Sequence, residues 1–227
     1  MQFDLLQLPA LIYLITSGQT TAHTTPATED FLNILRLVRS AVAARIDLVQ
    51  IREKNLSASV LYELATVAAR ITEGSATKLL INDRSDIAAT SGAVGVHLTT
   101  SSLPTAVVRQ AFGDEFVIGA SVHSIEEATV ARSSGANFAV FGPVFDTASK
   151  REYGPPLGVP ALARVTSELA PFPILAIGGV GLVNVGNCIA AGARGVAAIT
   201  MLQQPDTLAD VAEEIRRRSH EVSTTSR

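Results

Sequence analysis

The sequence is poor in cysteine, and its one thiol, Cys188, has no partner for an intrachain disulfide. No apolar run approaches the roughly 20 residues of a membrane-spanning helix. No Lys or Arg precedes the first apolar stretch, so a signal peptide is not expected. Charged residues make up only 17% of the chain and the net charge is −3, so no basic face offers itself to nucleic acid or acidic lipid. We therefore expect a cytoplasmic protein with neither a nucleic-acid nor a membrane partner.

What the chain does contain is a strict alternation of short apolar runs and longer amphipathic ones. Hydrophobic residues make up 47% of its 227 residues, enough to bury a full core. The short runs are β-branched or aliphatic almost throughout, as in strands that are buried on both faces. The expected strands are Leu11–Thr16, Leu48–Glu53, Lys78–Asp83, Gly95–Thr100, Val117–His123, Phe138–Phe145, Ile174–Gly178 and Gly195–Thr200. The stretches between them have helical spacing, with Ser57, Ser124 and Asp206 where N-caps belong.

Alternating strands and helices predict a parallel sheet, which is either closed as a barrel or open and doubly wound. Eight repeats over this length favour closure. An open sheet would usually carry a G-x-G-x-x-G turn after its first strand, whereas residues 17–20 read Ser-Gly-Gln-Thr. We predict the α/β class and a single (β/α)8 TIM barrel, with one domain over residues 1–227 and the barrel over about 11–219. No role is assigned to residues 1–9.

Polar side chains stand where these buried strands end. Because TIM barrels carry their active sites at the C-terminal ends of the strands, such side chains are candidate site residues. Alternation places Gln50, Arg52 and Lys54 on one side of the second strand. The other polar strand ends contain Asn82, Asp83, Ser121, His123, Thr147, Ser149, Lys150 and Thr200.

Three cations and a glycine loop at these strand ends are typical of a site that binds an anion. Arg52, Lys54 and Lys150 supply the charge, and the glycines at 178, 179 and 181 let backbone N–H groups approach a phosphate closely. Barrels frequently bind phosphate at the loops after strands seven and eight. The sequence therefore predicts a small phosphorylated substrate.

Several of these polar residues also have an interpretation that needs no ligand. Arg52 and Lys54 could form exposed ion pairs with Glu53 or Asp83, and such pairs contribute little. Asp83 could instead cap the short helix that follows it. His97 lies among apolar neighbours and is expected to be a hydrogen-bonded core residue.

His123 ends a strand beside two serines, which favours a site role. Cys188 is expected to be inert packing within a helix.

Five strings occur in order at successive strand ends, and together they resemble the thiamine phosphate synthase/TenI superfamily over about residues 11–202. The strings are Gln-Ile-Arg-Glu-Lys at 50–54, Asn-Asp-Arg at 82–84, Ser-Val-His-Ser at 121–124, Gly-Pro-Val-Phe-Asp-Thr-Ala-Ser-Lys at 142–150 and Ala-Ile-Gly-Gly-Val at 176–180. The resemblance implies a TIM barrel of thiamine biosynthesis that acts on phosphorylated thiazole and pyrimidine compounds. Barrels of this kind often form homodimers.

The resemblance also implies roles for individual residues. Arg52, Lys54, Asn82 and Lys150 match a clamp for departing diphosphate, and Gln50 and Ser121 match a pyrimidine pocket. Thr147 and Ser149 match hydroxyls near Lys150. Gly178 lies in the glycine run, and Gly179, Ile199 and Thr200 match a thiazole phosphate pocket.

One departure from the family pattern concerns the metal. In synthases, an aspartate after the fourth strand joins the equivalent of Asp83 in holding Mg²⁺, but here that position is Ser102. A neutral hydroxyl is a poor replacement for a carboxylate ligand. This favours the TenI branch, a thiazole tautomerase that needs no cofactor, with His123 as its acid/base and with Arg52 and Lys150 beside it. The alternatives are a Mg²⁺-dependent thiamine phosphate synthase and a non-catalytic barrel that binds thiazole or thiamine phosphates.

Overall fold

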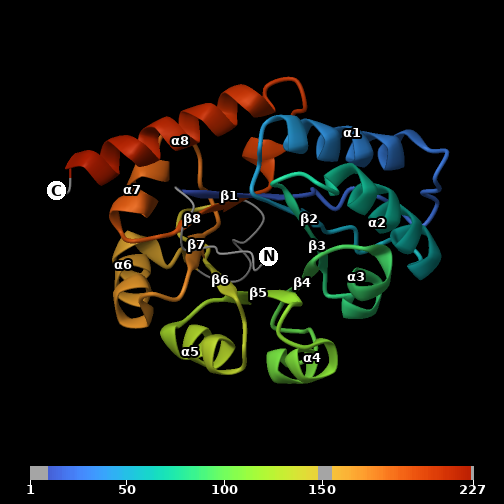
Figure 1. Cartoon of the computed structure of the whole chain (residues 1–227). Helices are drawn as coiled ribbons and strands as arrows, with labels where there is room; N and C mark the ends of the chain where they lie inside the picture. The colour runs from blue at the N-terminus through green and yellow to red at the C-terminus, as the bar shows by residue number, and fades with distance from the viewer. Residues whose placement is uncertain (1–9, 148–154, 226–227) are drawn as a thin grey trace.

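The computed structural model describes residues 10–147 and 155–225, and its centre is a closed barrel of eight parallel strands. Each strand pairs with its neighbours in sequence, and β1 closes the ring against β8 (Figure 1). The strands are β1 (Leu11–Ile15), β2 (Leu48–Ile51), β3 (Lys78–Asn82), β4 (Gly95–Leu98), β5 (Val117–Val122), β6 (Phe138–Phe141), β7 (Ile174–Ala176) and β8 (Gly195–Ala198). The predicted (β/α)8 TIM barrel is confirmed.

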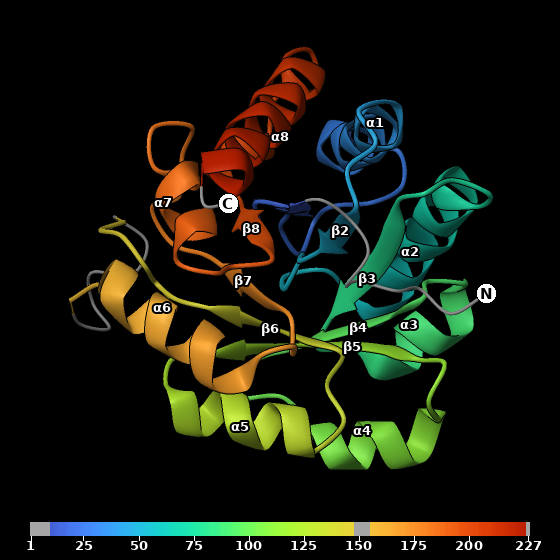
Figure 2. The same cartoon turned by 60° about the vertical axis from the view of Figure 1, so that its left-hand side comes forward.

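Helices surround the ring on its outside, so each strand is covered on both faces (Figures 1 and 2). They are α1 (Glu29–Ala43), α2 (Ala58–Thr72), α3 (Ser85–Ser91), α4 (Thr105–Phe112), α5 (Ile125–Ser133), α6 (Gly158–Leu169), α7 (Val185–Ala190), the short 3-10 helix η2 (Thr200–Leu202) and α8 (Leu208–Thr225). Ser57 and Ser124 cap α2 and α5 as predicted. Asp206 does not cap α8, because the helix begins two residues later, at Leu208.

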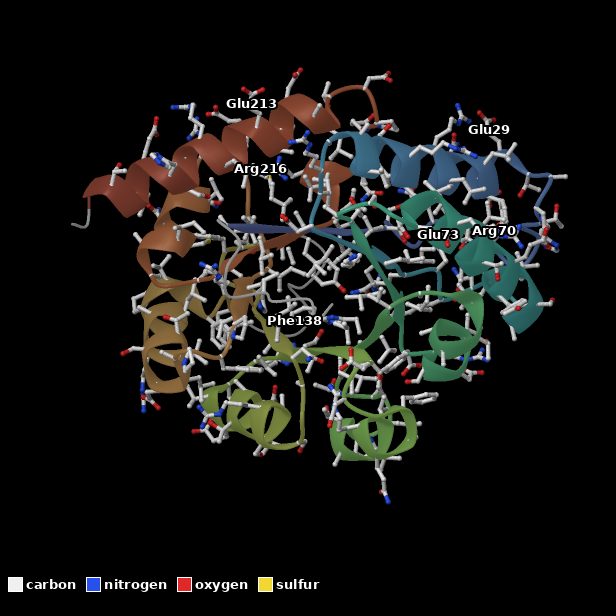
Figure 3. The ribbon with its side chains drawn as sticks, in the orientation of Figure 1. Glu29, Arg70, Glu73, Phe138, Glu213 and Arg216 are labelled. Atoms are coloured by element: carbon white, nitrogen blue, oxygen red, sulfur yellow. The ribbon has the colours of Figure 1, made fainter. Side chains whose placement is uncertain are left out.

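The barrel interior is filled by every second residue of the strands, as the two-residue period requires. Leu11, Tyr13, Leu48, Leu80 and Phe138 belong to one inner cluster of buried side chains. Figure 3 shows Phe138 within the ring of strands. The alternate residues face the helices and form a second, outer cluster. The barrel interior is therefore a core of packed side chains and not an open channel.

All eight strands begin where the sequence predicted, but each ends one to four residues earlier. The largest difference is in β6, which was expected to reach Phe145 and ends at Phe141. Pro143 follows closely, and a proline has no N–H to donate to a neighbouring strand. The residues lost from the strands are those at the C-terminal rim, where pairing gives way to loops. In residues 10–147 and 155–225, no helix combines the length and the apolar character that crossing a membrane requires.

Candidate functional site

The site residues expected from the sequence come from neighbouring strand ends. Gln50 lies within β2, Asn82 is the last residue of β3, and Ser121 is the penultimate residue of β5. Arg52 and Lys54 follow directly after β2. Because all eight strands are parallel, these ends lie on one rim of the barrel.

Polar side chains of β1 to β5 form a buried layer inside this rim. Gln50 donates from Nε2 to the Tyr13 hydroxyl at 2.7 Å. His97 Nε2 and Ser121 Oγ are 2.9 Å apart and share a hydrogen bond. The rings of Tyr13 and His97 are tilted against each other, with their centroids 5.7 Å apart. Tyr13 was not among the expected site residues, although its inward position in β1 follows from strand alternation.

Burial keeps the two rings of this layer neutral. Desolvation lowers the pKa of His97 to about 3, and it raises the pKa of the Tyr13 hydroxyl far above its ordinary value. His97 is 3% exposed, so the expected core role is confirmed. Within the described residues, Asn82 Oδ1 and His97 Nδ1 are buried without a hydrogen-bond partner. Unpaired buried polar atoms of this kind are costly, and a bound ligand can satisfy them.

Glu53 does not neutralise the cations beside it in the sequence. Glu53 is 4% exposed, and its carboxylate turns into the loop between β1 and α1. There it accepts hydrogen bonds from the Thr16 hydroxyl, from Gly18 N–H, and from both the N–H and the hydroxyl of Thr20. Neither Arg52 nor Lys54 forms an ion pair with any residue of 10–147 or 155–225. The interpretation as an ion-paired rim is therefore wrong for Glu53.

Asp83 stands exposed at the end of β3 with its backbone in the left-handed region, at φ 64°. It does not cap the following helix, because α3 begins at Ser85 without a side-chain cap. The expected second metal position, Ser102, accepts a hydrogen bond from Thr99 N–H at 2.8 Å and so stabilises its own turn. Among the described residues, no three His, Cys, Asp or Glu side chains gather to hold a metal. Of the two positions expected to hold Mg²⁺, Asp83 therefore supplies a carboxylate and Ser102 does not.

The glycine loop after β7 packs tightly against the loop after β6. Gly178 and Gly179 have positive φ values of 92° and 63°. A Cβ on Gly178 would lie 2.4 Å from Pro143 Cβ, and one on Gly179 would lie 2.5 Å from the carbonyl oxygen of Asp146. Both glycines are therefore required by backbone conformation and by space.

The third glycine of the loop, Gly181, differs from the other two. Its N–H donates to Asn184 Oδ1 at 2.8 Å and so stabilises the loop itself. Asn184 also donates from Nδ2 to the carbonyl of Gly179, so one side chain stabilises the loop through two hydrogen bonds. On the neighbouring strand end, Ile199 is half-buried and Thr200 is exposed at the start of η2.

His123 lies directly after β5 and is 40% exposed at its side chain. Glu127, four residues on in α5, accepts from His123 N–H at 2.7 Å and lies 3.2 Å from Nδ1 through the same oxygen. This contact directs the Nδ1 proton to the carboxylate and leaves Nε2 for an outside group. Glu127 was not expected, although its spacing of four residues from His123 in a helix could have pointed to it.

Four other residues singled out from the sequence remain. Thr147 is half-buried at the edge of the described segment. Ser149 and Lys150 lie outside the described residues. Cys188 is fully buried, and desolvation raises the pKa of its thiol to about 11, which suits the expected packing role.

The family model and the relatives of known name point to the same family. A family model described as thiamine monophosphate synthase matches residues 12–202. A protein of Geobacter sulfurreducens with the provisional name thiamine-phosphate synthase is 43% identical over 175 residues, which are 77% of this chain and 82% of the relative. The thiamine-phosphate synthase of Methanospirillum hungatei is 36% identical over 77% of this chain and 85% of its own length.

A solved structure agrees with these sequence relatives. Thiamine phosphate pyrophosphorylase from Pyrococcus furiosus superimposes with a TM-score of 0.80 at 26% identity, over 96% of this chain and 99% of that one. All three proteins carry names of the synthase reaction. They favour the alternative weighed from the sequence over the tautomerase that was preferred there.

Proposed function

The chain belongs to the thiamine monophosphate synthase family, and from that premise we propose that it is itself a thiamine phosphate synthase. The reaction couples hydroxymethylpyrimidine diphosphate to thiazole phosphate. The bond between the pyrimidine methylene and the diphosphate oxygen breaks, the thiazole nitrogen forms the new C–N bond, and diphosphate leaves. The names of the relatives support this reaction for the family.

The observation that carries the proposal is the cationic pair after β2. Negative charge builds on the diphosphate as its bond breaks, so the site must stabilise that charge in the transition state. Arg52 is half-buried and Lys54 is exposed, and neither is neutralised by the carboxylate between them. With Asn82 and Lys150, they act as the clamp for the departing diphosphate.

The buried polar layer binds the pyrimidine ring. Gln50 is held through its Nε2 by Tyr13, and so its Oε1 is left to accept a hydrogen bond from the ring's amino group. Ser121, fixed by His97, contributes its hydroxyl from β5. Asn82 Oδ1 is buried and unpaired in the described residues, and we assign it to the bound substrate as a hydrogen-bond acceptor.

The thiazole phosphate occupies the opposite side of the rim. Gly178 is half-buried and Gly179 is exposed after β7, and Ile199 and Thr200 follow β8. Thr147 and Ser149 closely precede Lys150 in the sequence, and we assign their hydroxyls to the phosphate groups beside that lysine. In this proposal the thiazole nitrogen lies against the methylene that loses diphosphate.

Mg²⁺ fits this rim only as an ion held jointly by protein and substrate. Asp83 supplies one exposed carboxylate, and Ser102 is engaged in its own turn. Mg²⁺ sites built from one or two carboxylates plus substrate phosphate oxygens are common. When bound, the ion would neutralise charge on the diphosphate.

A second candidate is the tautomerase expected from the sequence, with His123 as the acid/base. The contact between His123 and Glu127 favours it, because a carboxylate that fixes one ring nitrogen leaves the other ready to move a proton. The non-catalytic phosphate-binding barrel has no observation of its own in its favour.

A turnover assay tests the proposal. Full-length protein with both substrates and Mg²⁺ should form thiamine phosphate and inorganic diphosphate in equal amounts, and His123→Ala should keep most of that activity. Conversion of one thiazole tautomer to the other without metal, lost by about 10²–10⁴-fold in His123→Ala, would establish the tautomerase instead. Binding of both phosphates without any product would leave only the non-catalytic barrel.

A further inference from the structure

The cationic end of β2 is built on a buried network with Glu53 at its centre. Arg52 N–H donates to the Thr16 hydroxyl at 2.9 Å, and that hydroxyl donates to Glu53 Oε1 at 2.6 Å. The same oxygen accepts from Gly18 N–H at 3.2 Å. One carboxylate oxygen therefore connects the backbone of Arg52 to the end of β1.

The second carboxylate oxygen fixes the rest of the β1–α1 loop. Glu53 Oε2 accepts from Thr20 N–H at 3.2 Å and from the Thr20 hydroxyl at 2.7 Å. Asn55 strengthens the connection, because its Nδ2 donates to the Thr20 carbonyl at 2.9 Å. Residues 16–20 and 53–55 thus form one hydrogen-bonded unit from two separate loops.

This unit also forms the surface on which the Arg52 side chain lies. A Cβ built on Gly18 would lie 3.1 Å from Arg52 Nη1, so the guanidinium passes directly over Gly18. Gly18 has a φ of 74°, and its N–H is held by Glu53. The loop that Glu53 fixes is therefore in contact with the charged group of Arg52.

Each carboxylate oxygen of Glu53 is occupied by two neutral donors, an arrangement that satisfies a buried carboxylate without a cation. We propose that Glu53, acting through Thr16 and Gly18, is a positioning residue that holds Arg52 in place for the diphosphate and leaves its charge unpaired. The inference rests on the proposed function and adds a role for a residue that does not touch the substrate.

Calorimetry with inorganic diphosphate on full-length, metal-free protein tests this role. Glu53→Gln replaces one acceptor oxygen with an NH2 group, which must face a donor of Thr16, Gly18 or Thr20. Thr16→Val removes the hydroxyl between Arg52 and Glu53 at almost constant volume. Both variants should weaken diphosphate binding on the order of tenfold to hundredfold, because an Arg52 guanidinium that has moved loses its aligned contacts with the diphosphate. Thr16→Ser, which keeps the hydroxyl, should bind as the unmodified protein does.

Two further readouts separate positioning from general damage. In turnover, Glu53→Gln and Thr16→Val should raise the KM for the pyrimidine diphosphate and leave the KM for thiazole phosphate unchanged, since that pocket lies at β7 and β8. Glu73→Gln is the matched control, because Glu73 is an exposed carboxylate just after α2 (Figure 3). If Glu53→Gln fails to fold, the comparison of Thr16→Val with Thr16→Ser decides the question alone.

The outcomes distinguish this inference from the proposed function. Unmodified protein that binds diphosphate while Thr16→Val binds it equally well would overturn the positioning role only. Equal rises in both KM values would also overturn it, since they indicate a general disturbance of the barrel. Unmodified protein that binds no diphosphate would overturn the proposed function and this inference with it.

Discussion

At the scale of single residues, burial decides what the ionisable groups of this site can do. Glu53 and His97 are 4% and 3% exposed, and both are committed to partners within the protein. Arg52 is half-buried and has no ion-pair partner in the described residues. The string Gln-Ile-Arg-Glu-Lys therefore contains two kinds of charged residue: cations that we propose bind a ligand, and an anion that stabilises the loop between β1 and α1.

His97 makes the stability of the protein sensitive to acid. Its pKa is about 3 when folded and near 6.5 in an unfolded chain, so between these values the unfolded chain binds one more proton. Stability is therefore lost as the pH falls through this window, at about 1.4 kcal/mol per pH unit where the difference is a full proton. His97→Gln, which keeps a donor near Ser121 but cannot titrate, should show a correspondingly shallower loss.

Urea unfolding of both proteins at several pH values from 7 down to 4 checks this prediction. Carboxylates contribute to the slope in both proteins, so the comparison concerns the difference between them. Parallel slopes would mean that His97 is protonated in the folded protein at ordinary acid pH.

At the scale of elements, the strands could be predicted from the sequence and their ends could not. Every strand start was correct because apolar runs are set by burial on both faces. The ends were placed too late because residues such as Arg52, Asp83 and His123 continue the alternation after hydrogen bonding between strands has stopped. The contacts of Glu53 with residues 16–20 were beyond prediction, since they join loops that only the closed barrel brings together.

The glycine loop after β7 is the element whose substitution should have the clearest effect. Gly179→Ala would combine a positive φ with a Cβ 2.5 Å from the Asp146 carbonyl, so the loops after β6 and β7 must move apart. We expect a loss of about 1–3 kcal/mol in stability and a marked loss of affinity for thiazole phosphate.

Two glycines serve as controls for this variant. Gly181 has no heavy atom within 4 Å of a built Cβ and no positive φ, so Gly181→Ala should retain affinity. Gly113 shares the positive φ, at 75°, but lies outside the site and also has open space, so Gly113→Ala isolates the conformational cost. Thermal unfolding and calorimetry measure the two effects. Unchanged affinity in Gly179→Ala would place the phosphate elsewhere.

At the scale of the whole molecule, the barrel and the family could be predicted from the sequence, whereas the branch of the family could not. Eight repeats and five motif strings fixed the first two. Ser102 pointed to a tautomerase because it replaces the second carboxylate with which synthases hold Mg²⁺. The structure gives Ser102 a local role in its turn, and the named relatives are synthases. One substituted ligand is a weak indicator when the substrate itself brings phosphate oxygens.

The most direct test of the account is the rate of thiamine phosphate formation as free Mg²⁺ is titrated, in the unmodified protein and in Ser102→Asp. The account predicts a saturable metal requirement that EDTA abolishes. It also predicts half-saturation at lower Mg²⁺ in Ser102→Asp, because a second carboxylate joins Asp83 in holding the ion. A full rate in EDTA, or no thiamine phosphate at any Mg²⁺ concentration, would contradict it.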